Sequence, residues 1–319
     1  MPLDHYVPQV HLRKFYSPAL GDLMYATRKS DLRSFTPNSK SVCRIEDGST
    51  NSYLQNDRLI EEFLKTIEPK YNSAVAKLME GEIDPESIYA IAGFVAYVIR
   101  CSPTGMRTFS EPLKAALETT AFVADEHKAL PTSPEALGGR SISEILQSGD
   151  IKIEVDPKYP QALGIQGIME NVAAFGNFKW DILFNRFGGS PFFTSDFPVA
   201  IEPTRHWGVV NRIVPLAPNL AVRIRPDLTI NGKRADLSFA NFDHVKRDVS
   251  HSELVEINRL IVRCAEECVF YRDQFPWVEN FITKNRHYRV ELITNRQREG
   301  NGYLQVSTTR VVPYRQRAG

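Results

Sequence analysis

The sequence lacks the short signatures that mark the large nucleotide-binding and hydrolase classes. It has no G-x-G-x-x-G or G-x-x-x-x-G-K-[ST] phosphate loop, no H-E-x-x-H pair for zinc, and no G-x-S-x-G nucleophile turn. It also has no internal repeat and no low-complexity tract. The simplest assignments to those classes are therefore excluded.

Cysteine and long hydrophobic runs are scarce as well. The four cysteines lack the paired C-x-x-C spacing of a zinc site, so we interpret them as reduced, buried thiols. The longest apolar stretch, residues 88–99, is too short to span a bilayer. No basic start followed by an apolar run opens the chain, as a signal peptide would. We expect a cytoplasmic protein that does not use a membrane.

A large net charge of either sign is also absent. The chain has 39 basic and 38 acidic residues, which gives no overall field toward nucleic acid or a membrane. The charges are uneven, however: residues 46–86 hold 10 acidic and 4 basic residues, and residues 284–319 hold 2 acidic and 8 basic ones. The basic C-terminal segment can meet phosphates of a nucleotide or nucleic acid. A solvated or internally paired surface is the commoner outcome for such a segment.

The chain has 319 residues, 42% of them hydrophobic, which is ample for a continuous core. Apolar residues at three-four spacing predict one kinked helix over residues 60–78 that continues through Pro69. Asp84 is predicted to cap a buried helix ending near Arg100, with further helices over residues 110–128 and 162–175. We interpret residues 39–52 as a loop.

Short β-branched and aromatic runs after residue 177 predict a twisted, mainly antiparallel sheet. An S-x-x-E capping box at Ser250 opens a further helix, and the chain closes with a hairpin. Helices first and strands later indicate an α+β fold. We expect a single domain over residues 1–319. It has a helix-rich half (about 54–176) and a sheet-rich half (about 177–319), and the N-terminal hairpin of residues 22–37 joins the sheet-rich half.

The stretch "FFTSDFP" is the most site-like part of the second half. It delivers Thr194, Ser195 and Asp196 together at the end of a hydrophobic strand. Asp196 can act as a general base or hold a metal, and Thr194 and Ser195 can bind a ligand. The alternative, which we favour from this stretch alone, is a turn in which Asp and Ser bond nearby backbone N–H groups.

Four further residues are candidates. His5, in "HYVPQVHLRKF", can be an acid, a base or only a packer of the N-terminus. Glu61 and Glu68 border the apolar stripe of their helix, where carboxylates usually pair with lysines such as Lys65. Arg100 ends a buried helix and needs an acidic partner, for which Glu61, Glu68 and Asp196 are the candidates.

The polar stretch "NFDHVKRDVSHSE" is a weaker candidate. It holds Asp243, His244, Asp248 and His251, residue types that ligate metals. We interpret it mainly as an exposed loop that precedes a capped helix.

Several pieces of the chain occur in a familiar order: "HYVPQVHLRKF", "IEEFLKTIE", "IRCSPTGMR", "FFTSDFP" and "VPLAP". In this order they resemble the domain of unknown function 4238 family, whose opening motif is His-x-Val-Pro-Gln-x-x-Leu-x-x-Phe. The resemblance spans nearly the whole chain. It carries no established activity, although some members look like parts of bacterial defence or toxin-like loci.

The resemblance singles out particular residues. They are His5, Pro8, Gln9, Leu12, Phe15, Glu61, Glu68, Arg100, Pro103, Thr194, Ser195, Asp196 and Pro198. The sequence departs from the family at Phe197, where the family usually has Asn, so a ligand contact by that amide would be missing.

Two hypotheses follow for this bacterial-type protein. The first is a hydrolase acting on a nucleotide or nucleic acid, for which a divalent metal such as Mg²⁺ or Mn²⁺ is a candidate cofactor. In it, His5, Asp196 and Glu68 are catalytic. Gln9, Arg100, Thr194 and Ser195 bind substrate, and Asp196, Glu61 and Glu68 hold the metal. The second is a non-enzymatic binding or regulatory protein in which the same residues form a structural network.

Overall fold

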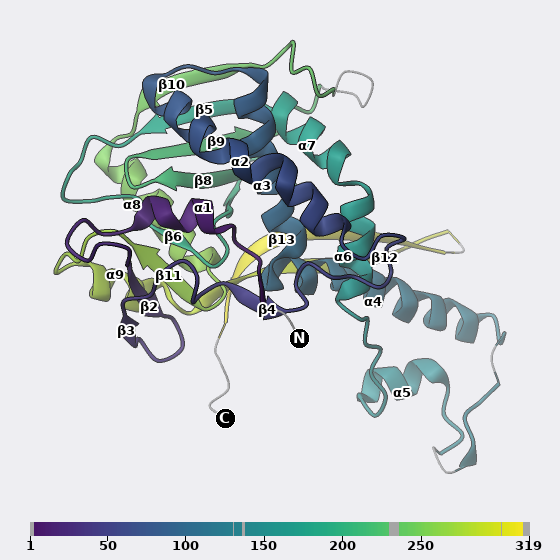
Figure 1. Ribbon diagram of the computed structural model, residues 1–319. Coiled ribbons are helices and arrows are strands. Elements are labelled where there is room, and N and C mark those ends of the chain that lie inside the picture. The colour runs from purple at the N-terminus through teal and green to yellow at the C-terminus, as the bar shows by residue number, and fades with distance from the viewer. Residues whose placement is uncertain (1–2, 130, 136–137, 230–235, 301, 315–319) are drawn as a thin grey trace.

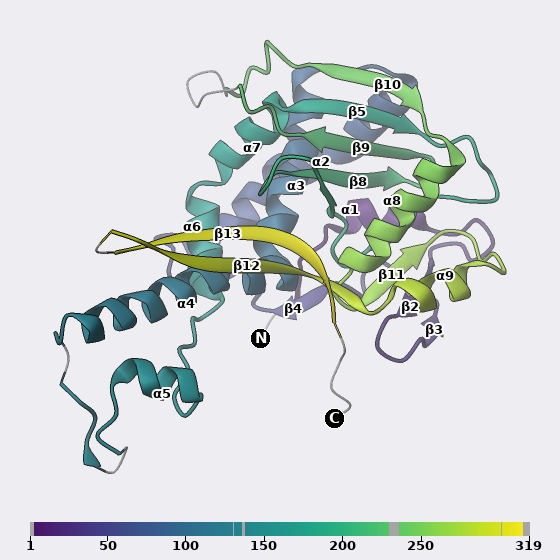
Figure 2. The same cartoon turned by 180° about the vertical axis from the view of Figure 1, so that it is seen from behind.

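The computed structural model describes residues 3–129, 131–135, 138–229, 236–300 and 302–314, and its fold is α+β. Helices of the first half lie against a sheet from the second half (Figure 1). One face of this sheet is covered by α2 (Leu59–Glu80), α3 (Pro85–Cys101) and α7 (Ile168–Asn177). The view from behind shows α8 (His251–Cys264) on the opposite face (Figure 2).

The central sheet has five strands in the order β10-β5-β9-β8-β7. Every neighbouring pair is antiparallel except β10 and β5. The strands are β5 (Lys179–Phe184), β7 (Ala200–Pro203), β8 (Val210–Ala217), β9 (Leu220–Arg225) and β10 (His244–Asp248). Our interpretation of the 243–251 stretch as a loop is therefore wrong for β10. This edge strand is mostly exposed and lacks the apolar alternation that identifies a strand.

A second sheet brings the two ends of the chain together. Its four strands are ordered β3-β2-β11-β6. They are β2 (Tyr25–Arg28), β3 (Ser34–Phe35), β6 (Thr194–Ser195) and β11 (Cys268–Tyr271). The predicted N-terminal hairpin is β2 with β3. The expected loop over residues 39–52 contains β4 (Arg44–Glu46), which pairs with β1 (Leu3–His5).

The helices begin and end largely where local signals place them. Helix α2 continues through Pro69, and the Asp84 side chain accepts a hydrogen bond from the Ser87 backbone N–H at 2.7 Å. Helix α4 (Pro103–Glu126) begins well before the predicted residue 110. Its cap is Ser102, whose hydroxyl accepts from the Gly105 N–H at 3.1 Å, and proline is favoured at a first helical position.

The remaining elements are short, apart from the closing hairpin. The predicted helix over residues 162–175 is divided between α6 (Lys158–Gln166) and α7. The others are α1 (Gln9–Leu12), the 3₁₀ helix η1 (Arg13–Phe15), α5 (Ile142–Ser148), α9 (Val278–Asn285), β12 (Tyr288–Glu299) and β13 (Gly302–Pro313). Strands β12 and β13 form the predicted closing hairpin.

One large hydrophobic core includes residues of α2, α3, α7, α8 and the central sheet. A smaller cluster lies under the N-terminal segment, where Val7, Leu12 and Phe15 are fully buried. In the described ranges, no single helix is both long and apolar enough to cross a membrane. Helices α3 and α4 reach that length and apolar character only when they are taken together, and they are bent by 62° at their junction.

Candidate functional site

His5 and Gln9 fasten the N-terminal segment to the residue 39 turn. The His5 Nε2 lies 3.1 Å from the Ser39 carbonyl oxygen, and the Ser39 hydroxyl donates to Gln9 Oε1 at 3.3 Å. Tyr97, from the buried helix α3, donates its hydroxyl to the His5 carbonyl at 2.7 Å. Burial lowers the pKa of His5 below its usual value. Each of these contacts joins the segment to the rest of the fold.

His11 is the residue that sequence reasoning missed. Its side chain is fully buried, with Nδ1 2.7 Å from the Tyr71 hydroxyl and Nε2 2.8 Å from the Thr194 hydroxyl. Its ring stacks on Phe94 at a centroid distance of 4.7 Å. Burial lowers the pKa of His11 to about 3, so the ring is neutral. A signal was present, because Val7, His11 and Phe15 recur at steps of four, which places His11 on the apolar face.

Thr194 and Ser195, predicted to bind substrate, are fully buried in β6. The Thr194 hydroxyl faces His11, as described above. The Ser195 hydroxyl accepts from the Phe197 backbone N–H at 3.1 Å, which is the turn expected as the alternative for this stretch. Both hydroxyls therefore have partners inside the protein.

Asp196, also buried, holds a turn of the backbone that lies far away in the sequence. Its Oδ1 accepts from the Glu266 N–H at 2.9 Å, and its Oδ2 accepts from the N–H groups of Glu267 and Cys268 at 2.7 and 2.9 Å. Burial raises the pKa of Asp196 to about 6, while these N–H groups and the Lys29 charge oppose that rise. Both carboxylate oxygens are thus engaged by main chain.

Glu61 and Glu68 have different surroundings. Glu61 pairs with Arg58 and with Lys65, whose Nζ lies 3.6 Å from Glu61 Oε1. Both partners lower the pKa of Glu61. Burial raises the pKa of Glu68, and the Arg13 charge opposes that rise. The pairing of Glu61 with Lys65 matches the ordinary reading of a border carboxylate.

The prediction that Arg100 needs an acidic partner is wrong. Its guanidinium lies 3.9 Å from the centre of the Phe109 ring, and Nη2 donates to the Asn171 amide oxygen at 3.4 Å. Its Nε is buried without a hydrogen-bond partner, and burial lowers the pKa of Arg100. The aromatic face and the amide replace a carboxylate, since each offers partial negative charge to the cation.

The 243–251 cluster spreads its side chains over different neighbours. Asp243 pairs with Lys179 at 3.3 Å, and Asp248 pairs with Arg186 at 3.0 Å. The rings of His244 and His251 pack on Phe242 and Phe187 respectively. Nowhere in the described part of the chain do three His, Cys, Asp or Glu side chains gather as a metal site would require.

The predicted catalytic and metal-binding residues therefore have separate partners. His5 contacts Ser39, Asp196 contacts residues 266–268, Glu61 contacts Arg58 and Lys65, and Glu68 feels the charge of Arg13. Within the described ranges, no hydrogen bond or ion pair joins any two of these four. One indirect link joins Glu68 to His5: the Glu68 charge acts on Tyr97, whose hydroxyl binds the His5 carbonyl.

The comparisons with known proteins agree with the motif order. No curated protein and no solved structure matches the chain. A family model described as "Protein of unknown function (DUF4238)" matches residues 4–275, which include His5, β6 with Asp196, and β11. That match covers most of the 319 residues, and the chain therefore belongs to the DUF4238 family.

Proposed function

We propose that this chain is a non-enzymatic binding or regulatory protein in which the residues of the family motifs form a structural network. The observation that carries this proposal is the coordination of Asp196 by three consecutive backbone N–H groups. A carboxylate so engaged has little capacity left for a metal or a water, and its bonds fix the turn between α8 and β11.

The other motif residues support the same interpretation. His5 and Gln9 both use Ser39, and Thr194 uses the buried His11. Each of these three side chains has an internal partner, as buried polar groups in stable folds usually do.

The hydrolase hypothesis stays as the second candidate, with a phosphate-containing nucleotide or nucleic acid as its substrate and Mg²⁺ or Mn²⁺ as its metal. One observation favours it: burial raises the pKa of Asp196 to about 6, and carboxyls with raised pKa values are common at catalytic sites. We also propose a cytoplasmic location, a bacterial source and a role in defence or toxin-like systems.

Asp196→Asn separates the two hypotheses. The amide nitrogen cannot accept a hydrogen bond, so we expect the variant to lose about 1–3 kcal/mol of unfolding free energy in denaturant titrations. Asp150→Asn, which changes an exposed carboxylate paired with Arg140, is the matched control and should unfold like the wild type. Wild type incubated with nucleotides and RNA, in Mg²⁺, in Mn²⁺ and in EDTA, should show no turnover.

The opposite pattern would overturn the structural role of Asp196. It consists of EDTA-sensitive turnover in the wild type that Asp196→Asn abolishes while its unfolding free energy stays unchanged. His5→Ala extends the test, because a clasp at Ser39 should lose stability and a catalytic imidazole should lose turnover alone.

A further inference from the structure

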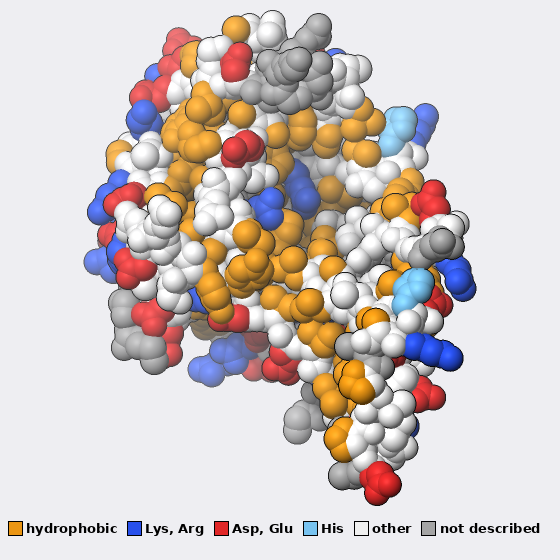
Figure 3. All heavy atoms as spheres, turned by 90° about the vertical axis from the view of Figure 1, so that its right-hand side faces the viewer, with side chains coloured by type: hydrophobic (Ala, Val, Ile, Leu, Met, Phe, Trp, Pro, Cys, Tyr) orange, Lys and Arg blue, Asp and Glu red, His pale blue; other side chains and the backbone are white. Residues whose placement is uncertain are grey.

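A pocket opens at one end of the central sheet, between the end of α7, the start of β8 and the end of β9. Its volume is about 280 Å³, near the lower end of small-molecule sites. It is lined by Phe175, Phe178, Gly208, Val209, Val210, Arg212, Ile224, Pro226 and Leu228. Figure 3 shows a hollow on this side of the molecule, with mostly hydrophobic walls and basic groups inside. Among the lining residues that the structure describes, Arg212 is the only charged one.

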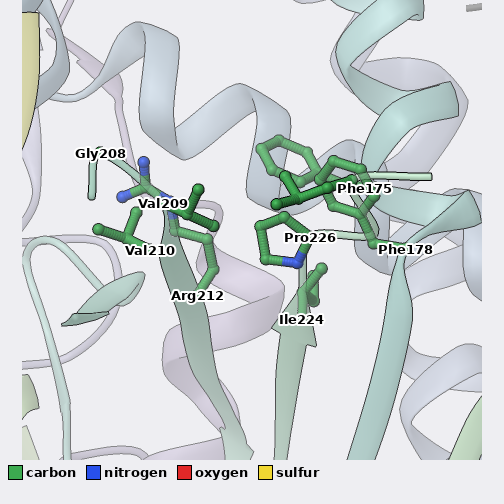
Figure 4. Close-up of a pocket in the computed structure, with 9 residues that line it drawn as sticks. Phe175, Phe178, Gly208, Val209, Val210, Arg212, Ile224 and Pro226 are labelled. Carbon is green, nitrogen blue, oxygen red and sulfur yellow. The ribbon is translucent and has the colours of Figure 1, made fainter. Parts of the chain in front are cut away.

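The two ends of the pocket differ in chemistry. In the close-up, the Arg212 guanidinium lies on one side near Gly208 and Val209, and the Phe175, Phe178 and Pro226 rings lie on the other (Figure 4). The rings of Phe175 and Phe178 meet edge to face, with centroids 6.1 Å apart. A ligand that fits both ends therefore combines a negatively charged group with an apolar, planar one.

Arg212 has no protein partner for its charge. Its guanidinium makes no hydrogen bond or ion pair with any residue that the structure describes. All the Asp and Glu residues of the sequence lie in the described ranges, so no acidic side chain elsewhere in the chain supplies the pairing. Burial and the neighbouring charge of Arg100 lower the pKa of Arg212 to about 10, which leaves it protonated at neutral pH.

The opposite face of the same sheet shows how this protein pairs an arginine that it uses for structure. Arg223, on β9, contacts the carboxylates of Asp181 at 3.6 Å, Glu202 at 3.0 Å and Glu253 at 2.7 Å. Arg212 lies in the adjacent cross-strand row, opposite Ile224, and points to the face of α7. A half-buried cation without a counter-ion carries an uncompensated desolvation cost, and such a site is prepared for an anion from outside.

A second cation, Arg100, acts electrostatically on Arg212. Arg100 binds Asn171, which is one helical turn before Phe175 on α7, and its charge acts on Arg212. The Arg100 charge repels that of Arg212, and an anion bound to Arg212 reduces that repulsion.

We propose that this pocket binds a small organic anion, with a phosphate or carboxylate group paired to Arg212 and a planar ring against Phe175 and Phe178. Guanidinium pairs with both acids through two parallel hydrogen bonds, so the shared chemistry is a planar or tetrahedral oxyanion on a ring-bearing molecule. This site is separate from the His5 and Asp196 network, and it stands whether or not the protein is an enzyme.

Thermal-shift and calorimetric titrations of the full chain test the proposal with four probes. Adenosine 5′-monophosphate carries a ring and a phosphate, benzoate carries a ring and a carboxylate, adenosine carries the ring alone, and inorganic phosphate carries the charge alone. We expect at least one of the first two to bind more tightly than both of the last two. The tighter of the first two identifies the acid.

Arg212→Met should weaken the binding of that probe by roughly ten- to a hundredfold, as expected for loss of a charge-assisted pair. The unliganded variant should melt at or above the wild-type temperature, because it no longer buries an unpaired charge, and this shows that it folds. Arg186→Met, which removes an exposed guanidinium beyond the opposite end of β5, is the matched control and should bind like the wild type.

Two results would overturn the proposal. One is binding of adenosine 5′-monophosphate and benzoate that is no tighter than that of adenosine and phosphate. The other is binding that Arg212→Met leaves unchanged. In either case the Asp196 experiment keeps its own outcome, because that carboxylate takes no part in this pocket.

Discussion

His11 joins three elements that lie far apart in the chain. Its two ring nitrogens contact Tyr71 of α2 and Thr194 of β6, and its backbone belongs to α1. A fully buried imidazole is stable in this position only in its neutral form, because a charged ring would lack both water and a counter-ion. The attachment of the N-terminal segment therefore depends on a proton equilibrium.

The depressed pKa of His11 predicts a pH-dependent stability. The unfolded chain binds a proton near pH 6.5 and the folded chain only near pH 3, so unfolding takes up a proton between these values. This contribution is complete above about pH 6.5 and is lost as the pH falls toward 3, by at most about 1.4 kcal/mol per pH unit. Urea titrations across this range should show the loss in the wild type.

His11→Gln provides the comparison. Its side chain does not titrate, so the slope between pH 6.5 and pH 3 should become shallower by the His11 share, and stability at pH 7 should fall because one partner loses its bond. His206→Gln, at an exposed histidine, should keep the wild-type slope. An equal slope in His11→Gln and wild type would contradict the assignment of this pH dependence to His11.

Sequence reasoning predicts the partners of local contacts better than those of distant ones. The turn at Ser195, the N-cap at Asp84 and the pairing of Glu61 with Lys65 are local, so spacing alone predicts them. The contacts of Asp196 with residues 266–268 and of His11 with Thr194 join segments 70 or more residues apart. Local pattern carries no information about such contacts, and the expected acid for Arg100 failed for the same reason.

At the scale of elements, the junction of α3 and α4 is a turn of one residue. A single residue, Ser102, ends α3 and caps α4, and the two helices are bent by 62°. Gly105 lies so close to the end of α3 that a Cβ there would lie 2.0 Å from the Ile99 carbonyl oxygen. The early start of α4, which the sequence did not reveal, depends on this contact.

Gly105→Ala should therefore destabilise the protein by about 3 kcal/mol, since a methyl group cannot enter without moving the backbone of α3. Thermal or denaturant unfolding measures the change. Gly188→Ala is the matched control, because nothing lies within 4 Å of the position of its Cβ. Equal effects of the two substitutions would contradict the close approach of α4 to α3.

Element existence was easier to predict than element boundaries. Long periodic stretches such as α2 and the β12–β13 hairpin are confirmed, because each carries its own pattern. Strands β4 and β10 were missed, since each is short and largely exposed and is held mainly by pairing with a strand from elsewhere in the chain.

At the scale of the whole molecule, the central sheet separates two electrostatic environments. One face buries Arg223 with three carboxylates, and on the other the described residues supply no carboxylate to Arg212. Since one hydrophobic core includes residues from α2 to β12 on both sides of this sheet, we propose that the two halves are one domain.

This asymmetry predicts opposite effects for the same substitution. Arg223→Met should lose about 3 kcal/mol of unfolding free energy, because Glu202 loses its cation, although Asp181 keeps Arg225 and Glu253 keeps Arg247. Arg212→Met should lose none. Denaturant titrations of both variants and wild type, run at one pH and salt concentration, make the comparison. Similar losses in both variants would contradict the unpaired state of Arg212.

The sheet order β3-β2-β11-β6 also has a consequence for synthesis of the chain. Thr27 of β2 and Tyr271 of β11 are in contact across 244 residues. At the usual pace of translation, roughly 12 to 50 seconds pass between the appearance of the two strands at the ribosome. Through that interval the edge of β2 that later pairs with β11 has no partner. The segment that carries the family's opening motif likewise waits for its contacts with the second half of the chain. For this protein, the N-terminal residues are made early and placed late.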